Sequence, residues 1–156
     1  MAEQLQLVSS PQTATTGNDF YTPASLFLAL DLTFDLDVCA PPGGVPWIPA
    51  ARHLTLEDDG LAQPWAGRVW MNPPFSRPAP WVERFIAHGN GVALLPQAKS
   101  RWFGALWSSS VALMCIPETF GFIRPGPGVN DIASPLVLAA FGAECVAAIS
   151  RLGRVR

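Results

Sequence analysis

Hydrophobic positions follow a period of two in residues 33–38, where apolar and acidic side chains alternate (TFDLDV). Such alternation is typical of a strand with one buried face. The longest apolar stretch, Ile132 to Ile149, is interrupted by Pro135, Gly142 and Glu144, so it predicts two buried strands, SPLVLAAF (134–141) and CVAAIS (145–150), and not a membrane span. The remaining predicted strands are RVWM (68–71), GVALLP (91–96) and VALMCI (111–116).

Other segments repeat apolar residues at helical spacing. DFYTPASLFLALDL (19–32) predicts a short helix with Thr22 as its N-cap and Pro23 in its first turn. APWVERFIAHG (79–89) predicts a helix that stops at its final glycine. SRWFGALW (100–107) predicts another helix.

Stretches without clear periodicity separate these elements. Residues 41–66 predict a long loop, and the polar residues 1–17 predict a flexible tail. Strands and helices alternate up to about residue 116, which is typical of an α/β fold with a mainly parallel sheet. FGFI (120–123) and the next apolar strand have no helix between them and predict a hairpin-like antiparallel element at the end. We therefore expect a single domain, 18–156.

Composition narrows the functional classes. The 156-residue chain is 49% hydrophobic and 14% charged, which is enough apolar material for a core. Its net charge of −2 lacks the basic excess of a dedicated nucleic-acid binder, so any contact with nucleic acid is expected to be local, transient or assisted by another subunit. Three dispersed Cys, and no basic and apolar leader segment, predict reduced thiols in a cytosolic protein without a metal site. His53 is expected to have no role, and His88 to close a helix.

The segment VWMNPPFS (69–76) runs from an apolar strand directly into a stiff turn. Pro73 and Pro74 fix two φ angles and remove two N–H donors. The side-chain oxygen of Asn72 and the carbonyl of Pro73 can each accept an N–H of a planar amino group, while Phe75 stacks on the attached ring. The pattern predicts chemistry at a conjugated or amide nitrogen. The alternative is a simple turn in which Phe75 fills the core.

Several other segments accompany this turn in a fixed order between about Asp19 and Phe103. They are DFYTP…LF, FDLDVCAPPGG, EDDGLAQPWAGRVWMNPPFS, PWVERFI and GNGVALLP. Together they resemble the phage-type DNA N6-adenine methyltransferases, which use S-adenosylmethionine. The resemblance implies a compact Rossmann-like methyltransferase sheet and methyl transfer to N6 of an adenine that is flipped out of double-stranded DNA.

The resemblance also implies which residues form the site. Asn72, Pro73, Pro74 and Phe75 would bind the adenine, with Phe75 at a position where Tyr is common. Asp37 would accept a hydrogen bond from the cofactor's ammonium group. The other implied cofactor contacts are Tyr21, Thr22, Pro23, Cys39, Ala40, Gly43 or Gly44, and Asp58 or Asp59.

Simpler interpretations remain for these cofactor residues. Asp37 can instead face water at a strand end, the segment 21–23 can be only a helix cap, and Asp58 and Asp59 can be solvated loop residues. The 34 residues 38–71 leave little room for the strand and helix units of a full methyltransferase sheet, so the ribose contact is expected from an irregular loop.

Basic and aromatic residues supply the expected DNA contacts. Arg77, Lys99 and Arg101 follow predicted strand ends and would contact phosphates, and Trp102 would contact a base. Taken alone, each basic residue fits an ordinary surface position better, and the other Trp residues are expected to pack in the core or in loops. The arginines of the C-terminal tail, Arg151, Arg154 and Arg156, would lie along DNA or form a disordered end.

Two other functional classes stay open. One is a methyltransferase that acts on RNA or on a glutamine amide of a protein, and the other is an inactive relative that only binds nucleic acid. The leading hypothesis expects no membrane and no metal as partners. It places the protein in the cytoplasm of a bacterial host, encoded by a phage or prophage and linked to restriction-modification.

Overall fold

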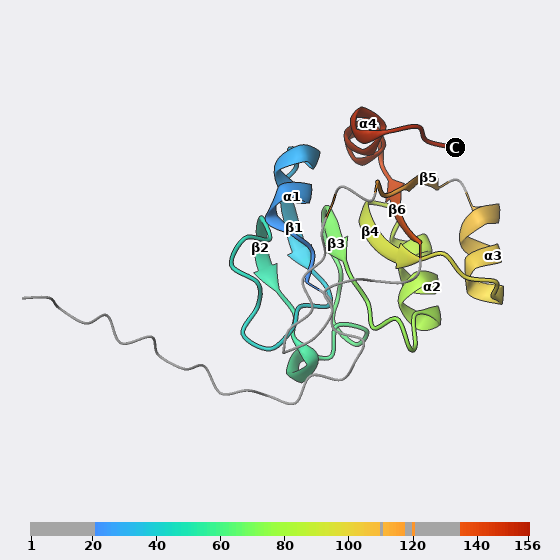
Figure 1. Ribbon diagram of the computed structural model, residues 1–156. Helices are drawn as coiled ribbons and strands as arrows, with labels where there is room; N and C mark the ends of the chain where they lie inside the picture. Colours follow the sequence, from blue (N-terminus) through green and yellow to red (C-terminus); the bar gives the residue numbers. More distant parts are fainter. Residues whose placement is uncertain (1–20, 110, 118–119, 121–134) are drawn as a thin grey trace, which may run out of the picture.

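A central six-stranded sheet carries helices on both faces (Figure 1). The computed structural model describes residues 21–109, 111–117, 120 and 135–156. The strands are β1 (Phe34–Asp37), β2 (Ala50–His53), β3 (Val69–Met71), β4 (Gly91–Pro96), β5 (Ala112–Cys115) and β6 (Leu136–Phe141). The helices are α1 (Ala24–Leu30), the 3-10 helix η1 (Leu56–Asp58), α2 (Ala79–His88), α3 (Arg101–Ser108) and α4 (Ala143–Leu152).

The strand order in the sheet is β2-β1-β3-β4-β6-β5. The pairings of β1 with β2, β1 with β3, and β3 with β4 are parallel. β6 is antiparallel to both neighbours, β4 and β5. The predicted α/β fold with an antiparallel C-terminal element is therefore confirmed. The predicted hairpin partner of β6 falls mostly in 121–134, and the predicted tail in 1–17, so both lie outside the described residues.

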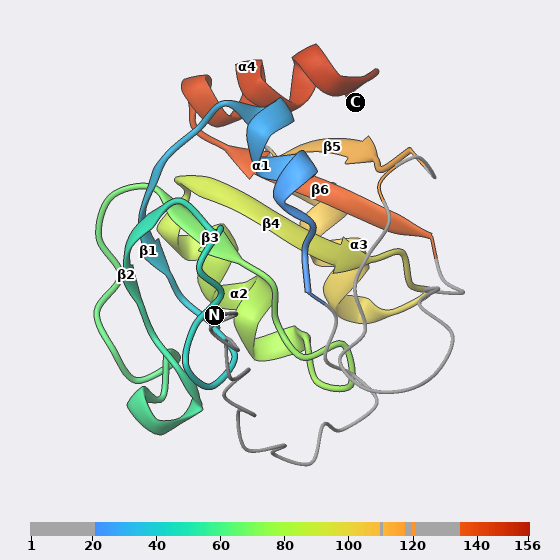
Figure 2. The same ribbon diagram turned by 60° about the vertical axis from the view of Figure 1, so that its left-hand side comes forward.

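The faces of β3 show how the core divides into two layers. Trp70 packs with α1 and α4 in one apolar cluster, whereas Val69 and Met71 pack with α2 and α3 in the other. All three side chains are fully buried, because successive residues of a strand point to opposite faces and helices cover both faces of this sheet. The Trp70 ring contacts the Phe27 ring of α1 at a centroid distance of 4.7 Å. Figure 2 shows α1 and α4 together on one side of the sheet, with α2 and α3 behind it.

Two predicted elements are wrong. Residues 41–66 are not one loop, because they contain β2 and η1. β2 is an edge strand whose two central residues are exposed, so it lacks the apolar alternation of a half-buried strand. The segment 145–150 lies in α4 and is not a strand: its buried residues Cys145, Ala148 and Ile149 have helical spacing.

No helix in the described part of the chain is long and apolar enough to cross a membrane.

Candidate active site

The carboxyl ends of β1 and β3 lie next to each other at the topological switch point of the sheet. From β1 the chain adds β2 on one side, and it then crosses to β3 on the other side. Ligands of open α/β sheets bind in the crevice that forms at such a point. Asp37 is the last residue of β1 and pairs in register with Trp70 of β3. Trp70 lies two residues before Asn72. The fold therefore places the predicted cofactor carboxylate and the predicted catalytic amide at the same edge of the sheet.

The turn 72–75 continues β3 beyond its last residue. Pro73 is buried, Pro74 is exposed, and Asn72 and Phe75 are half-buried. The Phe75 ring packs against the apolar cluster that contains Trp70 and α1. Its half-buried ring thus combines core packing with an exposed part, and the stacking role on a substrate stays a prediction.

Thr22 connects the segment before α1 to this turn. The Asn72 side-chain N–H donates to Thr22 Oγ1 over 3.5 Å, and Trp47 Nε1 donates to the Thr22 main-chain oxygen over 2.7 Å. The predicted role of Thr22 as an N-cap is wrong, because the N-cap of α1 is Pro23 and it makes no side-chain capping bond. The Thr22 hydroxyl is instead within hydrogen-bond reach of the Asn72 amide. Tyr21, which precedes it, is half-buried against the same apolar cluster as Phe75.

Asp37 is almost fully buried and its carboxylate has two partners. Oδ1 accepts from the main-chain N–H of Cys39 over 3.3 Å, and Oδ2 lies 3.1 Å from His53 Nδ1. Because Asp37 is only 1% exposed, the interpretation in which it faces water is wrong. His53, for which no role was expected, does contact Asp37, because β2 places it opposite Asp37 in register. That contact has no signal in the sequence as long as β2 is taken for a loop.

The buried position of Asp37 affects its ionisation. Burial raises its pKa above the ordinary value of 3.8, although the bonds from His53 and Cys39 and the charge of His53 act in the opposite direction. A raised pKa means that the native state holds a proton that the unfolded chain has already lost. The free energy of unfolding therefore falls as pH rises upward from about 3.8.

An Asp37→Asn variant is expected to gain stability relative to the wild type as pH rises from about 4 to neutral, because the amide does not ionise. Urea unfolding of both proteins at about pH 4, 5.5 and 7 measures this difference in the free energy of unfolding. A variant that instead loses stability relative to the wild type with rising pH contradicts the burial argument.

The turn after β1 contains the other predicted cofactor residues. Gly43 and Gly44 have φ angles of +80° and +71°, which favour glycine. A Cβ atom on Gly43 would meet nothing within 4 Å. Glycine is therefore favoured at this position by its backbone conformation and not by a lack of space. Cys39 is half-buried, and Ala40 is buried with its N–H bonded to the Leu54 oxygen over 2.7 Å.

The acidic pair after β2 is exposed. Thr55 donates its main-chain N–H and its hydroxyl to Asp58 Oδ2, at 2.8 and 3.1 Å, and these bonds lower the pKa of Asp58. Asp59 is exposed and ends η1 with a φ angle of +53°. The carboxylate of Asp58 thus caps η1, and the ribose or adenine contact of either residue stays a prediction.

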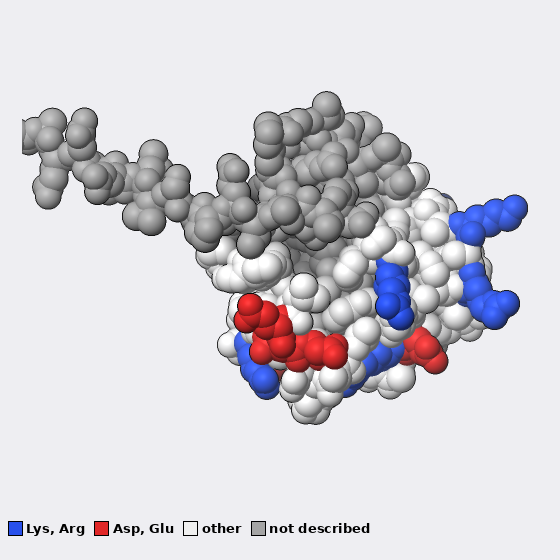
Figure 3. Space-filling view, turned by 90° about the horizontal axis from the view of Figure 1, so that it is seen from below, with Lys and Arg blue, Asp and Glu red and all other residues white. Residues whose placement is uncertain are grey.

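Charge is unevenly distributed along the lower edge of the molecule. Figure 3 shows most of the visible Asp and Glu side chains in one group, with Lys and Arg side chains both next to that group and spread toward the right of the described surface. Arg77 follows β3, and Lys99 and Arg101 follow β4; all three are exposed. Trp102 is half-buried and meets the Phe103 ring edge-on at 5.6 Å. The DNA contacts of these four residues stay predictions.

Comparison with known proteins decides the family. Residues 10–121, well over half of the chain, match the family model described as DNA N-6-adenine-methyltransferase (Dam). The chain belongs to this family. A DNA N-6-adenine-methyltransferase of Haemophilus phage HP1 (strain HP1c1) is 35% identical over 80 residues, which cover 47% of this chain and 44% of that relative. The chain thus spans less than half the length of this relative. No solved structure matches this chain.

The Dam-family match includes the loop before β3, whose attachment to α2 has no counterpart in our sequence predictions. Arg84 of α2 donates to the main-chain oxygens of Leu61 and Gln63. Its guanidinium lies 4.8 Å from the Trp65 ring, which stacks on Trp81 at 6.5 Å. The sequence predicted only that Trp65 and Trp81 would pack in the core or in loops, and it gave no indication of the Arg84 contacts. The attachment fixes the path by which the chain of this Dam-family member enters β3 and the turn at Asn72.

Metal ligands are not clustered in the described part of the chain: no three His, Cys, Asp or Glu residues there are placed to hold an ion. Cys39, Cys115 and Cys145 form no disulfide.

Proposed function

We propose that this chain transfers a methyl group from S-adenosylmethionine to N6 of an adenine in DNA. The observation that supports this most strongly is the proline-stiffened turn 72–75 at the switch point beside Asp37, in a chain of the Dam family. The family description and the name of the phage relative both specify adenine N6 in DNA.

The donors and acceptors at the ends of β1 and β3 suit the polar end of this cofactor. The ammonium group needs an acceptor, and the Asp37 carboxylate is the acidic group at the carboxyl end of β1, next to β3. His53 and the Cys39 N–H hold that carboxylate in one orientation. When bound, S-adenosylmethionine would supply an electrophilic methyl group for transfer to N6, and Asp37 would hold its ammonium group.

The turn 72–75 prepares the attacking nitrogen. The Asn72 side-chain oxygen and the Pro73 carbonyl accept hydrogen bonds from the two N–H groups of adenine N6. These bonds stabilise the positive charge that develops on N6, before N6 loses a proton to water. Thr22 orients the Asn72 amide through its hydroxyl. Phe75 stacks on the base, which must leave the DNA stack to reach the turn.

The charged surface is consistent with a local DNA contact. The basic residues Arg77, Lys99 and Arg101 lie after β3 and β4, whereas acidic residues surround η1 after β2. We propose that the DNA backbone crosses the β4 and α3 side of the edge, where phosphates meet positive charge. This methylation would serve a phage or prophage by altering sites that restriction enzymes recognise.

The test uses purified chain with S-adenosylmethionine that carries a labelled methyl group. Equal amounts of adenine-containing duplex DNA, RNA and a protein mixture are offered as acceptors, and duplex DNA of only G and C is the matched control. Label is expected in the adenine-containing DNA alone and as N6-methyladenine. Label only in RNA or protein would establish the alternative acceptor, and no binding of the cofactor in calorimetry would establish an inactive relative.

A further inference from the structure

The C-terminal residues run beside the edge strand β5. The Arg156 N–H donates to the Leu113 oxygen over 3.0 Å, and the Leu113 N–H donates to the Arg156 oxygen over 3.3 Å. Arg151, at the end of α4, donates to the Leu30 oxygen and so ties α4 to α1. The interpretation of this basic tail as a disordered end is therefore wrong, and its arginines have defined positions.

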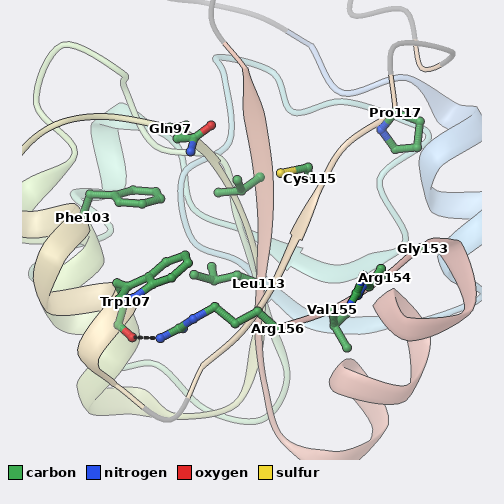
Figure 4. A pocket seen from close by; sticks show the side chains of 11 residues that line it. Gln97, Phe103, Trp107, Leu113, Cys115, Pro117, Gly153, Arg154, Val155 and Arg156 are labelled. Atoms are coloured by element: carbon green, nitrogen blue, oxygen red, sulfur yellow. Dashed lines mark hydrogen bonds between the residues drawn. The ribbon is translucent and has the colours of Figure 1, made fainter.

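A cavity of about 530 Å³ lies between this tail, β5 and α3. Leu113 and Val137 form its apolar floor, and the rings of Phe103 and Trp107 project from α3 toward β5 (Figure 4). Gln97, directly after β4, also lines it. A cavity of this size, mostly apolar with a few polar groups, fits a small planar ligand such as a nucleobase.

Two arginines give the cavity positive charge. The guanidinium of Arg156 lies 3.5 Å from the centroid of the Trp107 ring and donates to the Trp107 main-chain oxygen over 2.9 Å. Arg154 is exposed and also lines the cavity. Neither arginine forms an ion pair with a carboxylate of the described residues. A guanidinium held in place in this way retains further N–H donors in a planar array that suits phosphate.

We propose that this cavity binds one nucleotide of the DNA that flanks the target adenine, an inference that rests on the proposed function. The base stacks against Trp107 and Phe103, the Gln97 amide faces its polar edge, and Arg154 and Arg156 contact its phosphate. The cavity is thus a second DNA contact, separate from the turn at Asn72, and it contributes to affinity and to local sequence preference.

The position of the cavity agrees with the geometry of DNA. β5 is three strand positions from β3, so the two strands are roughly 14 Å apart across the sheet. A rise of about 3.4 Å per nucleotide makes this distance roughly four nucleotides. Lys99 and Arg101 lie in and after the connection between Gln97 and α3, so exposed positive charge continues along the path.

The test is a scan of abasic sites through a duplex whose methylated adenine has been mapped. In the wild type, one abasic site about three to five nucleotides from the target should weaken binding about tenfold, as expected for a lost stacking contact. Trp107→Leu should lose the sensitivity to that one site, and Trp107→Phe should retain it. Leu28→Ala, which alters an 81% exposed apolar residue on α1, is the matched control.

The outcomes separate this inference from the proposed function. A Trp107→Leu protein with the wild-type abasic profile overturns the second contact while methylation stands, whereas a wild type that methylates no DNA overturns the function itself. Cofactor affinity should be unchanged in every variant. Arg154→Gln is a second, independent arm: it should lower the slope of log affinity against log salt by about one, and an unchanged slope counts against the phosphate contact.

Discussion

Replacement of Asn72 by Ala is expected to lower the turnover number for DNA methylation by about 100- to 1,000-fold, while cofactor affinity stays within about threefold. The amide oxygen acts on the charge that develops at N6, so its loss affects the transition state more than the binding of the ground state. Steady-state kinetics with labelled cofactor, together with calorimetry of cofactor binding, separate the two effects.

Two further variants make the Asn72 result specific. Ser76→Ala alters an exposed residue of the same segment and should keep full activity. Thr22→Val removes the hydroxyl that accepts from Asn72 and should lower turnover by roughly tenfold, a loss in the range of misoriented catalytic groups. If Asn72→Ala methylates DNA at the wild-type rate, the turn has no catalytic role and the proposed mechanism is wrong.

Gly60→Ala is expected to lower the free energy of unfolding by about 3 kcal/mol, at the upper end of overpacking effects. Gly60 is buried behind the carboxyl end of β1. An added Cβ would overlap the main-chain oxygen of Val38 and lie 3.1 Å from Cη2 of Trp81. Neither neighbour can yield easily, because one is backbone and the other is packed against Trp65. Urea denaturation followed by circular dichroism measures the change.

Gly104→Ala provides the matched control for this stability effect. Gly104 lies within α3, and a Cβ there would meet nothing within 4 Å. Alanine in a helix interior is favoured over glycine, so this variant should gain about 0.5–1 kcal/mol. A Gly60→Ala protein as stable as the Gly104→Ala protein would show that the loop before β3 can move away from β1.

Elements with strong local signals were predicted correctly. β1 follows the alternation of apolar and acidic residues, and β4 follows a continuous apolar run. α2 ends where its sequence indicates, because Gly89 adopts a φ angle of +71° and its N–H bonds to the Phe85 oxygen over 3.0 Å. Such signals depend on residues within a few positions of each other, and they are visible in a single sequence.

Elements defined by distant partners were predicted wrongly. β2 becomes a strand through its parallel pairing with β1, since its own central side chains are exposed. The segment 145–150 in α4 is rich in Ala and Val, which suit either a buried strand or a helix, and its packing against β6 and α1 decides for the helix.

The sequence by itself determined the order of the main strands and helices, the place of Asn72 after β3, and enough motif similarity to indicate the Dam family. Only the tertiary structure decided that His53 contacts Asp37, that Thr22 contacts Asn72, and that the C-terminal tail borders a cavity with Trp107. The reason is physical: each of these contacts joins segments that are far apart in the chain. Their formation depends on strand pairing and on the burial of polar groups, which no local pattern of residues encodes.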